Sequence, residues 1–292
     1  MEYRITHTTA YEYEQPVAVS HHAARFQPKQ NAVQSVTDLA LDISPRPALI
    51  RTRADYFGNE VSTFTIQEIH QRMEVTARSR VRVFAALPVA LNCSQSWRMV
   101  RERFRDPVSP ADVLPYEFCL DSPLVVATQH RADYASESFP DDTPILVGAS
   151  DLTRRIFSDF KYDPRATTVA TPLREVWEKR RGVCQDFAHV AVSCLRSLGL
   201  PARYVSGYLS TRPPAGKPRL VGADATHAWF AVYCPLSGWV DFDPTNNLIP
   251  IDEHITVAVG RDFSDVSPLS GVLSGGGEHE VDVSVDVEPI NS

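Results

Sequence analysis

The hydrophobic pattern of this chain changes its period about halfway along, and this change constrains the fold more than any other feature. Residues 1–85 alternate apolar and polar residues, for example in YRITHTTAYEYE and EVTARSRVRVF. A period of two predicts β-strands, because successive side chains of a strand point to opposite faces of a sheet. Several short strands at this spacing, separated by turn residues, predict an N-terminal β-sandwich-like domain.

In the second half of the chain the pattern becomes helical. The segments ILVGASDLTRRIFSDF and PLREVWEKRR are predicted helices, and a third begins after Gly182. In the third helix, apolar side chains from Cys184 to Leu198 recur on one face, and Gly199 with Pro201 forms a stop signal. The strand candidates ARYVSGYL, HAWFAVYC and WVDFDP follow it. We therefore expect an α+β core in which a central helix packs on an antiparallel sheet.

These patterns divide the chain into four segments. Residues 1–85 form the β-rich domain, and residues 146–250 form the helix-and-sheet core. Between them, residues 86–145 hold scattered prolines, which predict a linker or irregular layer with one short helix near 122–133. Residues 251–292 have the pattern of charged strands, which we expect to complete the fold.

The composition excludes several classes of function. The chain has 292 residues and a formal net charge of −7, so it lacks the basic surface that nucleic-acid binding needs. It has no apolar run long enough to span a membrane and no apolar N-terminal segment typical of a secretion signal. Its five cysteines are widely spaced without a CxxC pair, which predicts neither a disulfide framework nor a zinc site. We expect a reduced, cytoplasmic protein without a metal or other cofactor.

One of the five cysteines, Cys184, stands at the predicted start of the central helix. The first backbone N–H groups of a helix are unpaired, and the helix dipole is positive there. Arg180 and Arg181 lie just upstream in the sequence. Both features favour the thiolate, which is the nucleophilic form of a cysteine side chain. The periodicity also turns Cys184 toward the predicted sheet, at the edge of the core.

A predicted β-hairpin supplies partners for this thiol. HAWFAVYC and WVDFDP are joined by Pro-Leu-Ser-Gly, and two registers are open: Trp239 pairs with Tyr233 or with Ala231. In both registers the odd-numbered residues of the two strands share one face, because side chains alternate with period two. A slip by one residue would separate them.

The shared face of the hairpin carries candidate site residues. They are His227, Trp229, Asp241 and Asp243. Asp243 lies either directly or diagonally opposite His227, with the Cβ atoms roughly 5 or 7–8 Å apart, so the two side chains can form a hydrogen bond. Asp241 remains a rival partner for His227, and Trp229 is more typical of a core residue or a wall of the site.

These residue types suit a thiol mechanism. A thiol nucleophile needs a nearby base, and the base needs a group that fixes its orientation. We expect Cys184 to act as nucleophile, His227 as base and Asp243 as the orienting group. The backbone N–H of Cys184 is a candidate donor to an oxyanion. The second donor stays open, with Trp177, Tyr162 and Gln185 as candidates.

Four motifs in the second half carry a family resemblance. GVCQDFAH, GLPARYVSGY, THAW and GWVDFDPT, in that order, resemble the bacterial transglutaminase-like family, whose active site is similar to that of papain. The resemblance covers roughly residues 150–250, and the first 85 residues look like the N-terminal domain that accompanies this core. It implies a papain-like core with Cys184, His227 and Asp243 as the triad. It also implies a structural role for Asp186; Thr226 departs from the serine often found before the histidine.

Three other histidines are interpreted as lying outside the site. His21 and His22 are adjacent, so in a strand they point to opposite faces, and we interpret them as surface residues and not as a metal pair. His189 lies about a turn and a half from Cys184, and we expect it to face elsewhere.

Two classes of function follow. In the first, Cys184 attacks the amide carbonyl of a peptide or protein substrate and forms a thioester. Water as second substrate gives a peptidase or amidase, and an amine gives a transglutaminase; we favour hydrolysis, but the sequence does not decide. In the second, the chain is a catalytically silent peptide-binding or scaffolding module. A metal-dependent hydrolase would need a cluster of ligands, and we predict none.

Overall fold

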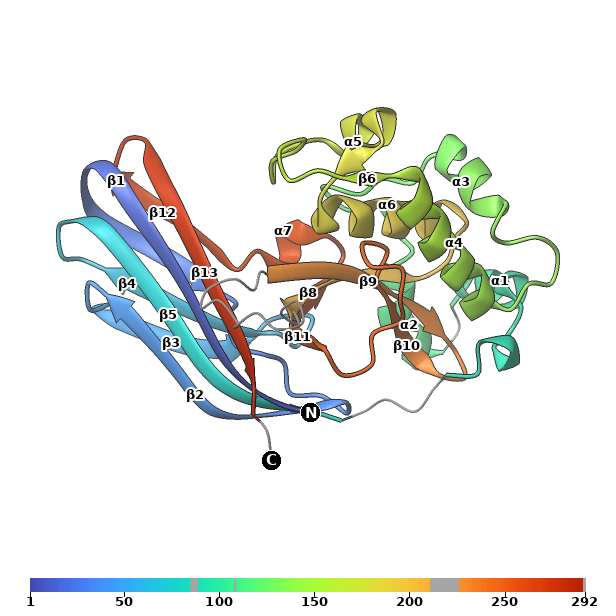
Figure 1. Cartoon of the computed structure of the whole chain (residues 1–292), viewed down its shortest axis with the longest axis horizontal. Coiled ribbons are helices and arrows are strands. Elements are labelled where there is room, and N and C mark those ends of the chain that lie inside the picture. Colours follow the sequence, from blue (N-terminus) through green and yellow to red (C-terminus); the bar gives the residue numbers. More distant parts are fainter. Residues whose placement is uncertain (85–88, 108, 211–225, 291–292) are drawn as a thin grey trace, which may run out of the picture.

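The computed structural model describes residues 1–84, 89–107, 109–210 and 226–290. Figure 1 shows a strand-rich part that holds both ends of the chain and a helix-rich part, with β8, β9 and β11 between them. The strands are β1 (Glu2–Ala24), β2 (Gln34–Ser44), β3 (Leu49–Ala54), β4 (Glu60–Ile66), β5 (His70–Val83), β6 (Lys161–Tyr162), β7 (Arg181–Gly182), β8 (Ala202–Leu209), β9 (Thr226–Cys234), β10 (Gly238–Phe242), β11 (His254–Gly260), β12 (Leu269–Gly275) and β13 (His279–Pro289).

The helices are α1 (Trp97–Arg105), α2 (Pro110–Glu117), α3 (Gln129–Ser136), α4 (Ile145–Asp159), α5 (Leu173–Lys179), α6 (Cys184–Ser197) and α7 (Phe263–Val266), with a 3₁₀ turn η1 (Leu91–Cys93). None of the helices in the described residues is long and apolar enough to cross a membrane. The predicted helices of the core correspond to α4, α5 and α6, and its three predicted strands to β8, β9 and β10.

The long strand β1 organises the N-terminal part. Its first half pairs with β5 and β13, and its second half pairs with β4 and β12. The register shifts between the halves, so the sheet bends and apolar side chains of both halves pack on each other in one cluster. The inner face follows the alternating pattern, but the prediction of two surface histidines is wrong for one of them: His21 is exposed and His22 is buried.

The last strands of the chain divide between the two parts. β11 pairs with β8 and completes the core sheet, whose strand order is β10-β9-β8-β11. β12 and β13 pair with β1 and complete the N-terminal sheet. The chain therefore leaves the N-terminal part after β5 and returns to it after α7. A strand's own pattern shows which face is apolar, and its partner is set only by long-range packing.

The segment 86–145, expected to be a linker or irregular layer, is largely helical where the structure describes it. It contains α1, α2 and α3, and Trp97, Phe104 and Ala135 of these helices are buried in the main core cluster. α2 and α3 have eight residues each, and α2 contains an internal proline. Helices this short are marginal in isolation, so they depend on the surface against which they pack.

The two parts join along β11, an edge strand of the core sheet. The side-chain amide of Gln34 donates to the Thr256 carbonyl at 2.7 Å and accepts from the Thr256 N–H at 2.9 Å. Asn59 makes the same pair of bonds with Val259, both at 2.8 Å. These two amides take the place of a neighbouring strand, so the backbone groups of a buried edge are satisfied. The N-terminal part therefore fixes the sheet on which the site is built.

Candidate active site

Helix α6 begins at Cys184, as the sequence predicts. The residue before it, Val183, donates its backbone N–H to Asp186 Oδ2 at 2.8 Å, and Thr167 Oγ1 donates to the same oxygen at 2.7 Å. Asp186 therefore caps the first turn. A Cβ on Gly182 would lie 2.4 Å from this carboxylate oxygen, so only a glycine lets the backbone at position 182 lie this close to the Asp186 side chain. The thiol side chain is half-buried at the helix start.

The β9–β10 hairpin brings His227 and Asp243 to one face. Trp239 pairs with Tyr233, which is one of the two registers that the sequence left open, and it sets His227 and Asp243 diagonally. Asp243 lies just beyond β10, where an antiparallel bridge to Leu248 holds it. His227 Nε2 and Asp243 Oδ2 are 2.8 Å apart.

The carboxylate of Asp243 is fully buried and accepts five hydrogen bonds. Oδ1 accepts from the backbone N–H groups of Thr245 and Asn246, at 2.9 and 3.2 Å. Oδ2 accepts from His227, from His254 at 2.9 Å and from the Asn246 side-chain amide at 2.7 Å. Burial by itself raises the pKa of Asp243, but the hydrogen bonds from the two histidines outweigh it and hold the pKa well below its usual range. Asp243 is therefore an ionised acceptor.

His227 links the carboxylate to the thiol. Its Nε2 is bound to Asp243, and its imidazole also interacts with Cys184. Burial lowers the pKa of His227, but the hydrogen bonds and negative charges of Asp243 and Cys184 together raise it to about 10. The arrangement therefore favours a protonated imidazole at neutral pH.

His254 is a site residue that the sequence analysis did not identify. It begins β11 and pairs with Leu209, so it lies across β8 from His227. The β8 residue paired with His227 is Gly207, where a Cβ would lie 2.1 Å from the Ile255 carbonyl and 2.6 Å from the Trp229 ring. The ring centroids of His227 and His254 are 5.7 Å apart. The only signal in the sequence is a histidine at the start of a strand, and the place of that strand in the sheet is not encoded locally.

Trp229 lies beneath the two imidazoles. Its side chain is fully buried, with its ring 5.0 Å from His254 and 6.0 Å from His227. It packs in a core cluster with Val205 and Ala231 and also lies beside both imidazoles. Asp241, the rival partner for His227, is also on this face, but burial raises its pKa and Arg203 supplies the opposing charge. Its charge is thus balanced within the sheet.

Two upstream arginines do not assist the thiol as the sequence suggested. The guanidinium of Arg180 stacks over the rings of Trp177 and Phe160, 4.3 and 4.6 Å from their centroids. Arg181 is largely exposed and lies 3.9 Å from the carboxylate of Asp163. The reason is local: Arg180 ends α5 in a left-handed conformation, which turns its side chain into an aromatic cluster. The helix start and His227 remain as the features beside the thiol.

The three oxyanion candidates lie in different places. Trp177 packs against His130 and Tyr134 of α3, within the same aromatic cluster as Arg180. Gln185 donates to the Val169 carbonyl at 3.5 Å. Tyr162 is closer to the thiol: β6 places it beside Gly182, and burial and the charge of Cys184 both raise its pKa.

His189 packs against Tyr204 of β8 and bonds to the start of α7. Its Nε2 accepts the backbone N–H of Phe263 at 3.1 Å, and burial lowers its pKa to about 4.

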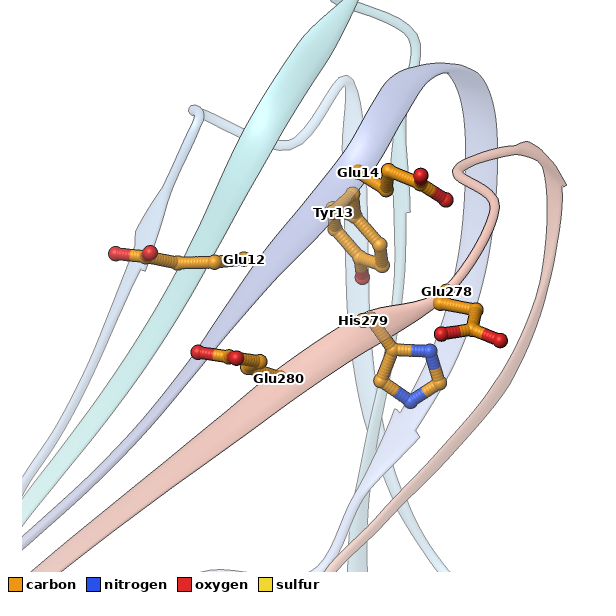
Figure 2. Close-up of a pocket in the computed structure, with 6 residues that line it drawn as sticks. All are labelled: Glu12, Tyr13, Glu14, Glu278, His279 and Glu280. Carbon is orange, nitrogen blue, oxygen red and sulfur yellow. The ribbon is translucent and has the colours of Figure 1, made fainter.

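A cavity of about 260 Å³ lies beside the first turn of α6, with a lining that includes Gln185, Asp186, Leu124 and Leu173. Figure 2 shows a different cavity, of about 350 Å³, on the N-terminal sheet; it is lined by Glu12, Tyr13, Glu14, Glu278, His279 and Glu280, which include none of the predicted site residues.

The prediction that the chain offers no cluster of ligand types is wrong. One atom from each of His227, Asp243 and His254 lies within 4.8 Å of the others, so the three could hold a metal ion by residue type and spacing. Their geometry is already that of a hydrogen-bonded set, because both Nε2 atoms lie within 2.9 Å of the same carboxylate oxygen. We interpret the cluster as such a set.

The comparisons agree with this architecture. Residues 3–82 match the family model for the bacterial transglutaminase-like N-terminal region, and residues 133–244 match that of the transglutaminase-like superfamily. An uncharacterized protein of Mycobacterium tuberculosis is 39% identical over 98% of this chain and 92% of its own length. A protein-glutamine gamma-glutamyltransferase of Pseudomonas aeruginosa is 31% identical, over 41% of this chain and 20% of its own length.

A solved structure shares the fold over the whole chain. It is named "Putative Cysteine Protease from Cytophaga hutchinsonii", has a TM-score of 0.77 and 20% sequence identity, and covers 100% of this chain and 91% of its own. The fold is therefore α+β, with a β-rich N-terminal domain ahead of a papain-like, transglutaminase-like core. The chain belongs to the transglutaminase-like superfamily.

Proposed function

We propose that this protein is a thiol-dependent amide-bond enzyme that acts through Cys184, His227 and Asp243. The observation that carries the proposal is His227 itself: its Nε2 lies 2.8 Å from an oxygen of a buried carboxylate, and its imidazole interacts with a thiol at a helix start. This is the arrangement that a thiolate nucleophile and its general acid–base need. The cavity beside α6 offers room for part of a peptide substrate.

The proposed reaction has two steps. The Cys184 thiolate attacks an amide carbonyl, and the negative charge moves to the carbonyl oxygen near the N-terminus of α6. The imidazolium then gives the Nδ1 proton to the leaving amine, the C–N bond breaks and a thioester forms. Water or a second amine next attacks the thioester, the imidazole takes a proton from it, and the thiolate leaves. Water gives hydrolysis, and an amine gives acyl transfer.

Selective alkylation tests the first premise. At pH 7 we expect iodoacetamide to modify Cys184 faster than Cys93, although Cys93 is exposed and Cys184 is half-buried. Intact mass spectrometry of the wild type, Cys184→Ser and the matched control Cys93→Ser measures this. Equal or slower modification of Cys184 would contradict an activated thiolate.

Trapping of an acyl group tests the reaction. On incubation with peptide libraries we expect a mass increase on the wild type that is absent from Cys184→Ser. Addition of a primary amine such as glycine methyl ester should release the group, and the ratio of acid to amide products separates a hydrolase from a transglutaminase. A protein that binds peptides equally well as wild type and Cys184→Ser, and never carries an acyl group, is the silent binding module.

A further inference from the structure

One oxygen of Asp243 serves two histidines. Oδ2 accepts from Nε2 of His227 at 2.8 Å and from Nε2 of His254 at 2.9 Å. The exposed fractions of the three residues are 8% for His227, 0% for Asp243 and 7% for His254. We propose that His254 is a positioning residue which, by sharing this oxygen, limits how strongly Asp243 holds the imidazole of His227. The inference rests on the proposed function of the triad.

The direction of the hydrogen bonds follows from the charge of Asp243. An ionised carboxylate only accepts hydrogen bonds, so both imidazoles carry a proton on Nε2. For His227 this directs Nδ1 to Cys184, and it makes His254 a donor to Asp243 and not a rival base. The backbone N–H groups of Thr245 and Asn246 donate to Oδ1. Among the described residues, Oδ2 accepts only from side chains, so a side-chain substitution changes the hydrogen bonds to Oδ2 and leaves those to Oδ1 in place.

Competition for the carboxylate gives His254 its effect. A carboxylate has about four lone-pair sites, and this one already accepts five bonds between 2.7 and 3.2 Å. Each donor disperses the negative charge and makes the carboxylate a weaker base. The hydrogen bond from His254 lowers the pKa of Asp243, so the charge left to stabilise protonated His227 is smaller. Without this donor, His227 should hold its proton more tightly.

The other charged groups around the site stay constant in this comparison. His227 faces Cys184 of α6, Asp243 beyond β10 and His254 of β11. Behind them, Asp241 of β10 is close enough to interact with His254, and Arg203 of β8 balances Asp241. Tyr162 of β6 and Tyr204 of β8 interact with the charge of Cys184. Because His254 also interacts with Asp241, two different substitutions at position 254 are needed to report on the shared oxygen.

Two substitutions separate the hydrogen bond from the bulk of the ring. His254→Phe keeps a flat ring against Trp229 and removes the donor, whereas His254→Gln keeps an N–H donor of similar reach. The full chain labelled with ¹⁵N-histidine is titrated by NMR, and the pKa of His227 is read for each protein. We expect His254→Phe to raise it by about one pH unit, the size expected for one charge-assisted bond. His254→Gln should stay close to the wild type.

Internal controls keep the result decisive. His189, whose pKa is lowered to about 4 by burial, titrates in the same spectra and should not move in any variant. Circular dichroism and thermal melts identify a variant that does not fold. If His254→Phe does not fold, His254→Gln provides the test. Because His254→Gln keeps the donor, a shift of the His227 pKa in this variant would overturn the proposal. An unchanged pKa in a folded His254→Phe protein would also overturn it.

The inference and the proposed function can fail separately. The NMR titration needs no substrate, so it tests His254 even if Cys184 forms no acyl-enzyme. Where the wild type is active, the alkaline limb of its kcat/KM profile should rise by about one pH unit in His254→Phe, with KM within about twofold. If the purified wild type contains one equivalent of a transition metal that His254→Gln loses, the hydrogen-bond account is wrong.

Discussion

At the scale of single residues, the charge of Asp243 is what keeps His227 protonated beside the thiol. Burial lowers the pKa of His227; the hydrogen bond to Asp243 is first among the causes that raise it to about 10, and Cys184 and the charge of Asp243 follow. An amide of the same shape would keep the space filled but remove that charge. The site thus depends on the charge of Asp243. The alternation of side chains along the two strands predicts that Asp243 and His227 share one face.

We expect Asp243→Asn to lower the alkaline limb of the kcat/KM profile from near pH 10 toward the ordinary histidine value of 6.5. Catalytic efficiency at pH 7 should fall by about 10²-fold or more, because the imidazole loses both its orientation and its proton. A pH series of initial rates measures both effects. The control is Asp241→Asn on the same face: if it lowers the limb and Asp243→Asn does not, Asp241 is the partner of His227.

At the scale of elements, the first turn of α6 sets the position of the nucleophile. Asp186 is buried and receives the Val183 N–H and the Thr167 hydroxyl, so it joins the helix start to the loop before α5. The family resemblance implies a structural role for Asp186, two positions after Cys184. Its second partner, Thr167, could not be predicted from the sequence, because the loop folds back only in the tertiary structure.

We expect Asp186→Ala to destabilise the protein by about 1–2 kcal/mol, as the loss of a helix cap does. The alkylation rate of Cys184 should fall in parallel, since the first turn frays. Urea unfolding and iodoacetamide kinetics measure the two effects. Thr167→Val, which removes one donor and leaves the carboxylate on the Val183 N–H, should have a smaller effect on both; a Cys184 rate unaffected by Asp186→Ala would show that the cap does not position the thiol.

At the scale of the whole molecule, buried histidines make stability depend on pH. Burial lowers the pKa of His7, His22 and His189 from 6.5 to about 4. His7 lies where the two parts meet and bonds to the Tyr208 hydroxyl at 2.9 Å. In the unfolded chain these histidines take up protons near pH 6.5, whereas in the folded chain they do so only near pH 4. The stability from these groups is therefore complete above pH 6.5 and is lost as the pH falls toward 4.

We expect the free energy of unfolding to fall between pH 6.5 and 4, by about 1.4 kcal/mol per pH unit for each such histidine. His22→Phe should reduce the slope, because the Nε2 of His22 has no hydrogen-bond partner among the described residues and its ring stacks on Phe64. Urea unfolding at several pH values measures the slope. His21→Gln, at an exposed position, is the matched control; equal slopes in all three proteins would contradict a burial cost at His22.

His227 acts in the opposite direction. Its pKa is raised, so the stability it contributes is complete below pH 6.5 and is lost as the pH rises through about 10. The three buried neutral histidines and this one charged histidine together place the most stable range near neutral pH. The balance is a property of the assembled molecule, because each shift depends on contacts between elements far apart in the chain.

The sequence by itself determined the features that depend on near neighbours. A period of two or 3.6 shows which face of a segment is apolar, so α6, the β9–β10 hairpin and the shared face of His227 and Asp243 could all be predicted. Only the tertiary structure decided which segments meet: β12 and β13 on β1, α1 to α3 on the core, and His254 on the oxygen already bound to His227. The physical reason is that local pattern encodes the amphipathic face of an element, whereas its partner is selected by packing and hydrogen bonding over long separations in the chain.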